Sequence, residues 1–239
     1  MTPALAWGAL AASSLVLGAW IGLIRTWPGR LVGAVLGFGA GALISAVSFD
    51  LAQEGVRLGG AEVMAVGLAC GASTYFLANR LLARSEVPTD DASSPSDAGP
   101  ALALGAFLDG IPEQLVLGIG LATGAGLSVG LLSAIFVSNL PEAIGSASAM
   151  RAAGHKPGAI LRLWTGVAVV CTLATMVGFA IADATSGGLQ AAIDGFAAGA
   201  LLVMLVDSMI PEAVRKAGDI AGLVTVFGFA VAAALSAIG

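Results

Sequence analysis

The sequence predicts an all-α protein that crosses a lipid bilayer several times, and three observations support this fold class. Hydrophobic residues make up 58% of the 239 residues, and charged residues make up only 10%. The mean hydropathy of +0.97 is far above that of water-soluble proteins. The apolar residues also form runs of roughly 20, the length that a helix needs to cross the hydrocarbon core. Because the backbone must pair its own polar groups inside lipid, we expect these runs to be helices.

Charged residues, glycines and prolines divide the apolar runs into eight expected transmembrane helices. The first run has no positively charged leader, so we expect a retained helix rather than a cleaved signal peptide. Small residues recur at four-residue spacing in several runs, which favours close helix packing. The whole chain, 1–239, is then one transmembrane domain with helices over 4–24, 31–56, 61–83, 100–123, 127–150, 158–182, 188–214 and 219–238.

One long polar insert separates the third and fourth expected helices. Residues 85–99 are acidic, rich in Pro and Ser and without apolar periodicity, which predicts a disordered linker. The ten basic residues are too scattered for a nucleic-acid-binding surface. If the chain crosses the membrane eight times, nine of the ten basic residues fall on one side of it: Arg25, Arg30, Arg80, Arg84, Arg151, Lys156, Arg162, Arg215 and Lys216.

Only Arg57 falls on the opposite side. Basic residues are enriched in cytoplasmic loops, so we expect the linker in the cytoplasm and both termini outside it. A cell membrane, the inner one in a two-membrane cell, is the expected location. The oligomeric state is open, a homodimer included.

Acidic residues inside the expected helices are the most informative feature of the sequence. A charge at the centre of a bilayer costs roughly 2.5 to 3.5 kcal/mol, so such acids usually face a bundle interior, water or a bound cation. Glu62 and Asp194 are set aside because they lie close to expected helix starts. The other seven acids are Asp50, Glu54, Asp109, Glu113, Glu142, Asp207 and Glu212.

These acids follow a repeated pattern, a polar residue followed four positions later by Glu, which places both on one helix face. The pattern occurs at Asp50/Glu54, Asp109/Glu113, Ser138/Glu142 and Ser208/Glu212, and Pro precedes the Glu in the last three. Proline removes a backbone hydrogen bond and frees a carbonyl near position i−4. Together with Asn139, the central pairs offer the oxygen donors that a divalent cation needs. Glu54 and Glu212 lie near expected helix ends, and for them an interfacial helix terminus is an equal alternative.

Other chemistry has little support in the sequence. His155 is the single histidine and lies beside Lys156 in an expected loop, so a Ser/His/Asp catalytic system is not available and we expect no enzyme. Cys70 and Cys171 fall within apolar runs, which favours small buried thiols over metal ligands.

The chain resembles the ZIP (Zrt/Irt-like) family of divalent-metal transporters in its eight expected helices, its cytoplasmic linker after the third, and its paired Pro-Glu motifs. Family members carry His-Asn-x-Pro-Glu on helix four, where this chain has Asp-Gly-Ile-Pro-Glu at 109–113. On helix five a His-x-x-Pro-Glu-like motif becomes Ser-Asn-Leu-Pro-Glu at 138–142. The resemblance implies a ZIP-like helix bundle and a metal site built from Asp109, Glu113, Ser138, Asn139 and Glu142, with Asp50, Glu54, Asp207 and Glu212 toward the ends of the pathway.

Two departures from the family pattern affect the expected chemistry. The family often supplies a bridging Glu from helix six, but 164–182 contains no acid, so we expect a single metal. Replacing imidazoles by Asp, Asn and Ser leaves an all-oxygen site, which lowers the preference for Zn²⁺ relative to Mn²⁺, Fe²⁺, Mg²⁺ or Ca²⁺ while Zn²⁺ still binds. The metal is expected as the transported substrate, with no resident cofactor.

The resemblance also implies that one helix group, including helices four and five, moves against another. Buried carboxylates are easier to protonate than exposed ones, so exchange of protons for the cation is a hypothesis. A proton-coupled carrier of a small organic solute is the alternative transporter, although only 6% of residues are aromatic and able to bind such a solute. A non-transporting ZIP-like membrane protein is a further alternative.

Overall fold

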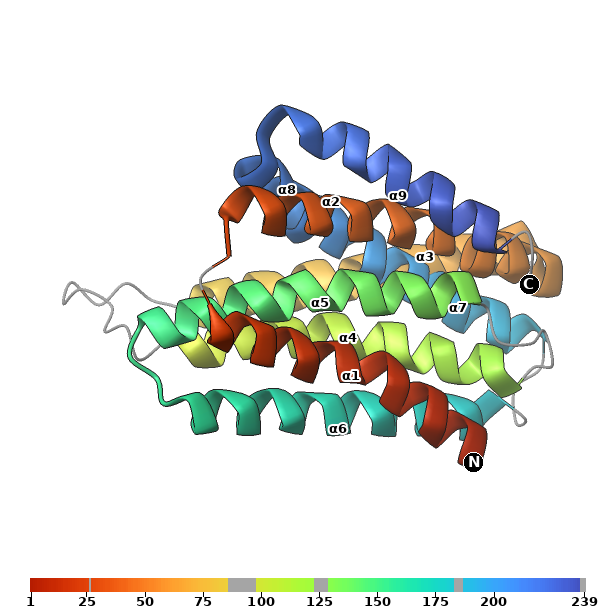
Figure 1. The fold of residues 1–239 in the computed structure, drawn as a ribbon. Coiled ribbons are helices and arrows are strands. Elements are labelled where there is room, and N and C mark those ends of the chain that lie inside the picture. Colours follow the sequence, from red (N-terminus) through yellow and green to blue (C-terminus); the bar gives the residue numbers. More distant parts are fainter. Residues whose placement is uncertain (26, 86–97, 123–128, 183–186, 237–239) are drawn as a thin grey trace.

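The computed structural model describes residues 1–25, 27–85, 98–122, 129–182 and 187–236, and within these ranges the regular structure is entirely helical (Figure 1). The all-α prediction is therefore confirmed for the described residues. In chain order the elements are α1 (Thr2–Ile24), α2 (Gly29–Ala46), the π-helix η1 (Val47–Gln53), α3 (Glu54–Ser85), α4 (Ala98–Ala122), α5 (Val129–Ala152), α6 (Pro157–Ala182), α7 (Gly187–Met204), the π-helix η2 (Leu205–Met209), α8 (Ile210–Ala217), the 3₁₀ turn η3 (Gly218–Ile220) and α9 (Ala221–Ser236).

Helical segments long and apolar enough to cross a membrane number four among the described residues: Thr2–Ile24, Gly29–Leu81, Pro157–Ala182 and Gly187–Ser236. Two of them, with 53 and 50 residues, are too long for a single crossing. At 1.5 Å per residue each would extend about 75 to 80 Å, against a hydrocarbon core of about 30 Å. Each contains a glycine with positive φ, Gly60 at 81° and Gly218 at 63°.

The chain reverses direction at these two glycines (Figure 1). Glycine has no Cβ and adopts positive φ at little cost, so it ends one helix and allows the next to run in the opposite direction. The segment Gly29–Leu81 is thus a helical hairpin with Gly60 at its tip, and Gly187–Ser236 is a second hairpin with Gly218 at its tip. Most of the expected linker, residues 86–97, lies outside the described residues, while α3 extends to Ser85 and α4 begins at Ala98.

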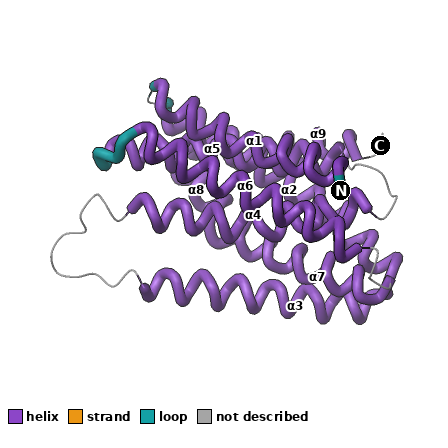
Figure 2. Tube along the Cα trace, turned by 90° about the horizontal axis from the view of Figure 1, so that it is seen from below, coloured by secondary structure: helices purple, strands orange, loops and turns teal. Residues whose placement is uncertain are grey.

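The helices pack in two groups (Figures 1 and 2). In the first group, α1 packs on α5 and α6, and α4 packs on α6. In the second group, α3 packs on α7, and α2 packs on α8 and α9. The main contact between the groups is that of α2 with α5. The first group contains α4 and α5, the two helices with a Pro-Glu motif in their interior, and the second contains both hairpins.

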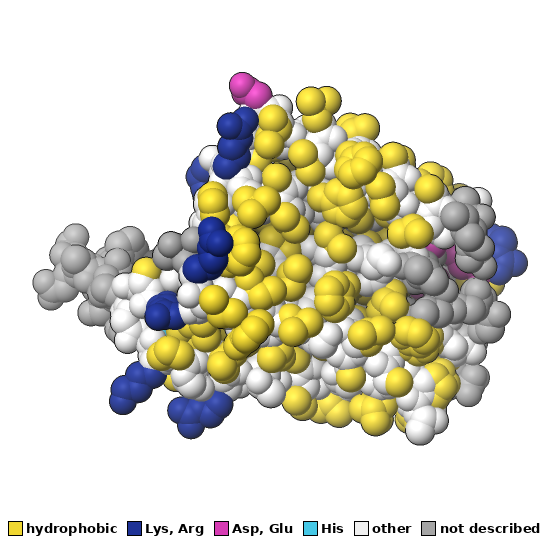
Figure 3. Space-filling view, in the orientation of Figure 1, with side chains coloured by type: hydrophobic (Ala, Val, Ile, Leu, Met, Phe, Trp, Pro, Cys, Tyr) yellow, Lys and Arg dark blue, Asp and Glu magenta, His cyan; other side chains and the backbone are white. Residues whose placement is uncertain are grey.

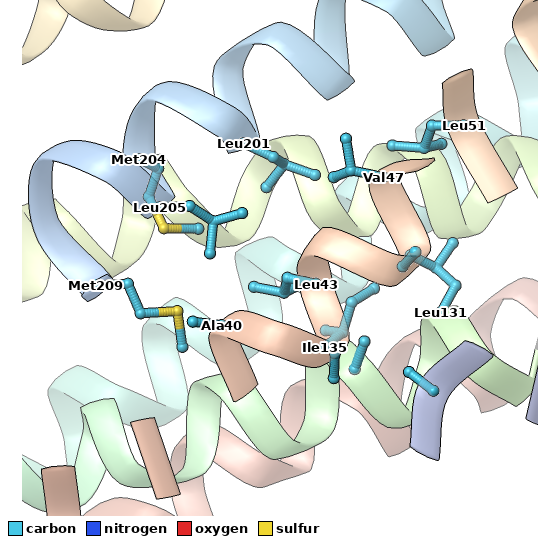
Figure 4. Packing of buried hydrophobic residues seen from close by; sticks show 14 of the residues in the cluster. Ala40, Leu43, Val47, Leu51, Leu131, Ile135, Leu201, Met204, Leu205 and Met209 are labelled. Atoms are coloured by element: carbon cyan, nitrogen blue, oxygen red, sulfur yellow. The ribbon is translucent and has the colours of Figure 1, made fainter. Parts of the chain in front are cut away.

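A hydrophobic core fills the space between the two groups (Figure 4). It includes Leu43 and Val47 from α2 and η1, Ile135 from α5, and Leu201 and Leu205 from α7 and η2. All five side chains are buried, and burying a Leu or Ile side chain contributes about 1.5 to 3 kcal/mol. The two groups are therefore held together at this core by apolar packing.

The outer surface separates apolar from basic side chains (Figure 3). Apolar side chains cover much of the visible face. The side chains of Leu223, Val226 and Phe227 on α9 are strongly exposed. Lys and Arg side chains gather at the end of the bundle opposite the N and C markers of Figure 1, with Arg30 at the start of α2 and Arg215 in α8 among them. An apolar belt with charges at its rim is the surface that a bilayer requires.

Candidate cation site

The two proline-containing helices carry the most deeply buried polar side chains of the predicted site. Glu113 of α4 is 1% exposed, and Ser138 and Asn139 of α5 are 2% and 3% exposed. Glu142, one turn after Asn139, is partly buried. Pro112 and Pro141 lie within α4 and α5 rather than at their ends. Pro141 cannot donate to the carbonyl of Val137, so a backbone oxygen is freed beside these side chains.

Helix α6 meets this region with two side chains that sequence reasoning did not assign to it. Cys171 is fully buried, and a Cβ atom on Gly110 of α4 would lie 2.7 Å from its Sγ atom. The carboxylates of Glu113 and Glu142 both lie near enough to interact electrostatically with the Cys171 thiol. Cys171 therefore lies within electrostatic range of both predicted carboxylates. The prediction of a buried thiol is wrong for the other cysteine, because Cys70 is exposed on α3.

One turn beyond Cys171, a buried hydrogen bond ties α6 to α4. Thr175 Oγ1 donates to Gln114 Oε1 at 2.5 Å, and both residues are completely buried. Gln114 follows Glu113 directly, so this bond fixes the turn of α4 that carries the carboxylate. The sequence signal for Gln114 was its polarity inside an apolar run, which a search restricted to acids does not detect.

Buried polar atoms without a hydrogen-bond partner occur on both helices. Among the described residues they include Asn139 Nδ2 and Gln114 Nε2. Most buried polar groups in proteins are paired, and leaving one unpaired costs about 1 to 3 kcal/mol. Each amide also carries an oxygen, and rotation about its last bond exchanges the two atoms. The Asn139 amide can therefore offer an oxygen to a ligand at the place where its nitrogen has no partner.

The outer acids belong to the second group of helices, and two of them, Asp50 and Glu54, lie in η1 and at the start of α3. Asp50 lies in η1 and accepts a hydrogen bond from Ser236 Oγ at 3.4 Å. Glu54 accepts from Arg57 Nε at 2.7 Å, close to the Gly60 tip. This pairing at a helix end favours the interfacial alternative for Glu54.

The remaining outer acids, Asp207 and Glu212, lie in η2 and α8. Asp207 is exposed in η2 and lines a cavity between α3 and α7. Glu212 lies 2.5 Å from Lys216 Nζ and 4.0 Å from Arg215 Nη2, so it too is an ion-paired helix-end acid. Asp50 and Asp207 both lie in π-helical turns, which are frequent at functional sites.

Asp194 is a buried acid that the sequence criterion set aside. Its position near an expected helix start suggested an interfacial group, but it is 4% exposed within α7. Its Cβ would lie 3.6 Å from a Cβ on Gly55, and it interacts electrostatically with Glu54. Burial by the neighbouring hairpin, and not distance from a helix end, determined its environment.

The described side chains do not form a ready-made metal cluster. No three His, Cys, Asp or Glu side chains among them are grouped closely enough to hold an ion. Asp109 belongs to α4, but its side chain lies outside the described part of the structure. The nine predicted metal-binding residues are therefore not brought together as one set. Of the central residues, Glu113, Ser138 and Asn139 are buried and Glu142 is partly buried, and the fold also buries Cys171 and Gln114, which the sequence criterion did not include.

Replacing Thr175 by Val is expected to lower the free energy of unfolding by about 1 to 3 kcal/mol, because both ends of the Gln114 amide then lack a partner in the buried α4–α6 contact. The midpoint of thermal unfolding in detergent micelles measures the effect. Thr172→Val is the matched control, since Thr172 Oγ1 donates only to the Ala168 carbonyl of its own helix. Equal midpoints for the two variants would contradict this role of Thr175.

The fold and the site define a helical integral membrane protein with a carboxylate buried inside an apolar bundle. The chain is similar to a protein of Arabidopsis thaliana named "Putative zinc transporter", with 30% identity over 186 residues, which is 76% of this chain. It spans only 30% of the length of that protein. No protein-family model matches the chain.

Proposed function

We propose that this protein carries divalent metal cations across a membrane as a ZIP-like transporter, through a site between α4 and α5. The observation that carries the proposal is the Glu113 carboxylate, which is 1% exposed in the interior of an apolar bundle, where Ser138 and Asn139 of α5 are also buried. A buried carboxylate in a membrane protein is retained where it binds a cation or a proton. The name of the similar Arabidopsis protein supports a metal as the cargo.

Eight crossings account for the helical elements. In this arrangement α1, α4, α5 and α6 cross once each, and the hairpins with tips at Gly60 and Gly218 cross twice each. The end of the bundle rich in Lys and Arg then faces the cytoplasm, together with the 85–99 linker, and both termini face the other side of a cell (inner) membrane.

Metal movement requires that the site opens to each side in turn. The two helix groups are the units that would move against each other. The first contains α4 and α5, and it meets the second mainly through the contact of α5 with α2. At that contact Gly39 of α2 lies against Ser138, where a Cβ atom would be 2.7 Å from the Ser138 Cα and 3.1 Å from Met209 Cε. A small residue and a flexible thioether permit the groups to shift against each other.

The substrates that the donor atoms favour are Mn²⁺, Fe²⁺ and Zn²⁺, with Mg²⁺ and Ca²⁺ to be included in any comparison. Carboxylate and amide oxygens bind all of these ions. Asp109, Glu113, Ser138, Asn139 and Glu142 form the central site. Of the outer acids, Asp50 and Asp207 attract cations toward it, whereas Glu54 and Glu212, which are paired with Arg57 and Lys216, contribute little. Binding of a divalent cation at buried carboxylates would displace protons, so each transported ion is expected to exchange for protons.

Uptake of metal by liposomes that contain the purified protein tests the proposal. We expect Mn²⁺, Fe²⁺ or Zn²⁺ to enter faster than into protein-free liposomes, and the double change Glu113→Ala with Glu142→Ala to stop this uptake. Size-exclusion profile and helical content of the double variant check its folding. If the folded double variant transports at the wild-type rate, the site is elsewhere. If the wild-type protein transports none of the five metals, it is not a metal transporter.

A further inference from the structure

A cavity of about 350 Å³ lies where the last turn of α1 meets the last turns of α5, at the end of the bundle where Lys and Arg side chains gather (Figures 1 and 3). Arg25, which follows α1 directly, and Arg151, near the end of α5, both line this cavity, together with Ser148. No acidic side chain is among the described residues that line it. Two positive charges therefore share one hollow without a carboxylate in its wall.

The two arginines of this cavity differ from other basic residues of the protein. Arg57 is paired with Glu54, and Lys216 is paired with Glu212. Arg25 and Arg151, by contrast, form no ion pair with any residue that the structure describes. Positive charges that lack a counter-ion at the rim of an apolar bundle attract anions.

The polar groups around the cavity are already arranged to favour an anion. Arg151 Nη1 donates a hydrogen bond to the Leu23 carbonyl, and Ser148 Oγ donates to the Gly22 carbonyl at 3.0 Å. These carbonyls belong to the last turn of α1, whose unpaired oxygens would otherwise repel a negative ligand. A guanidinium has five N–H donors, and the bond to Leu23 leaves most of those of Arg151 for a ligand. Guanidinium groups match the geometry of phosphate oxygens.

The cavity also lies at the level of the membrane–water interface. The apolar helix α1 ends at Ile24, which lines the cavity and is 59% exposed. Beside it, the guanidinium carbon of Arg25 lies 4.8 Å from the centre of the Trp27 ring, and Trp27 Nε1 donates to the Ile21 carbonyl at 3.1 Å. Tryptophan is enriched at the depth of lipid headgroups. The arginines are therefore next to an exposed apolar side chain, at the depth where lipid phosphates lie.

We propose that this cavity binds the headgroup of an anionic phospholipid, with Arg25 and Arg151 holding the phosphate and an acyl chain covering Ile24. Phosphate is the shared chemistry of a lipid headgroup and of dissolved inorganic phosphate. The exposed Ile24 favours the lipid, because an acyl chain can cover this side chain and inorganic phosphate cannot. This lipid site is separate from the proposed cation site, and the inference holds whether or not the protein carries metal.

A lipid at this place would connect α1 with α5. The two helices are in close contact along their length: a Cβ atom on Gly18 would lie 2.5 Å from the Leu140 carbonyl oxygen, and one on Gly22 would lie 2.6 Å from that of Ile144. The cavity lies at the end of this contact, where Arg25 belongs to one helix end and Arg151 to the other. A phosphate bound by both arginines should therefore stabilise the fold, as does any ligand that binds only the folded state.

Native mass spectrometry of the purified full-length protein, titrated with phosphatidylglycerol in detergent micelles, tests the inference. We expect Arg25→Gln combined with Arg151→Gln to weaken lipid binding by about tenfold or more, since each Arg beside an anionic lipid contributes about fivefold. Arg30→Gln combined with Arg162→Gln is the matched control, because it removes the same charge from exposed residues that do not line the cavity. At physiological salt this control should change the affinity by less than about threefold. Equal losses in the two double variants would overturn the inference.

Arg25→Gln alone is the variant least able to disturb the fold, because Arg25 donates no hydrogen bond to a described residue, whereas Arg151 holds the Leu23 carbonyl. It should weaken binding of phosphatidylglycerol by about fivefold. An unchanged affinity in this variant also overturns the inference.

Thermal unfolding with three different additives identifies the source of the phosphate. We expect phosphatidylglycerol to raise the unfolding midpoint of the wild-type protein in detergent, and phosphatidylcholine, whose ammonium group the arginines repel, to raise it less. Inorganic phosphate should leave the midpoint unchanged. An equal rise with inorganic phosphate would identify a dissolved anion as the ligand in place of a lipid. An equal rise with phosphatidylcholine would refute selection of an anionic headgroup.

Discussion

Replacing Glu113 by Gln is expected to lower the rate of metal uptake into liposomes by about a hundredfold or more. Gln has nearly the shape of Glu, so the change removes a charge without opening a cavity. Loss of one partner from a buried charge pair costs about 3 to 5 kcal/mol, which corresponds to about two to four orders of magnitude in binding. Because Glu113 is 1% exposed, little water is present to replace its interaction with the cation. Glu142→Gln should have a smaller effect, since Glu142 is only partly buried.

The matched control for this prediction is Glu212→Gln. Glu212 also follows a proline in the repeated motif, but its side chain is 40% exposed and is paired with Lys216 at the basic end of the bundle. An exposed ion pair contributes at most about 1 kcal/mol, so uptake should stay within about a few-fold of the wild-type rate. Initial rates of Zn²⁺ uptake at equal protein density make the comparison. A folded Glu113→Gln variant that transports as fast as Glu212→Gln would show that burial of this carboxylate is unrelated to transport.

Replacing Gly71 by Ala is expected to destabilise the fold by about 1 to 3 kcal/mol through steric overlap. Gly71 lies where α3 crosses α7, and a Cβ atom there would overlap the backbone carbonyl of Phe196. A backbone carbonyl cannot rotate away as a side chain can, so the two helices must separate. Close approach at small residues is a main source of helix association within lipid.

Gly166→Ala is the control for Gly71→Ala, because Gly166 of α6 has no atom of another element within 4 Å of the place where its Cβ would lie. Alanine favours a helix over glycine by about 1 kcal/mol, so this variant should be at least as stable as the wild-type protein. Thermal unfolding in detergent micelles, followed by circular dichroism, measures both. Equal midpoints for the two variants would contradict a close backbone contact at Gly71.

The general architecture could be predicted because it follows from local features of the sequence. Apolar content and the length of the apolar runs determine that the chain is helical and suited to lipid, because an apolar segment in a bilayer must satisfy its backbone within one helix. Gly60 and Gly218 lie in two of the gaps between expected helices, and both adopt the positive φ that glycine tolerates. The π-helices η1 and η2 were not predicted, since the change from one hydrogen-bond register to another has no such local signal.

The sequence by itself determined which carboxylates to consider, because the free energy of a charge in lipid depends mainly on its depth along the chain's apolar runs. Only the tertiary structure separated the buried Glu113 from the ion-paired Glu54 and Glu212 at the helix ends. It also brought Cys171 within electrostatic range of Glu113 and Glu142 and buried Asp194 against the first hairpin. The physical reason is that periodicity gives the face of a helix on which a residue lies, whereas the neighbour of that face is decided by how non-adjacent helices pack.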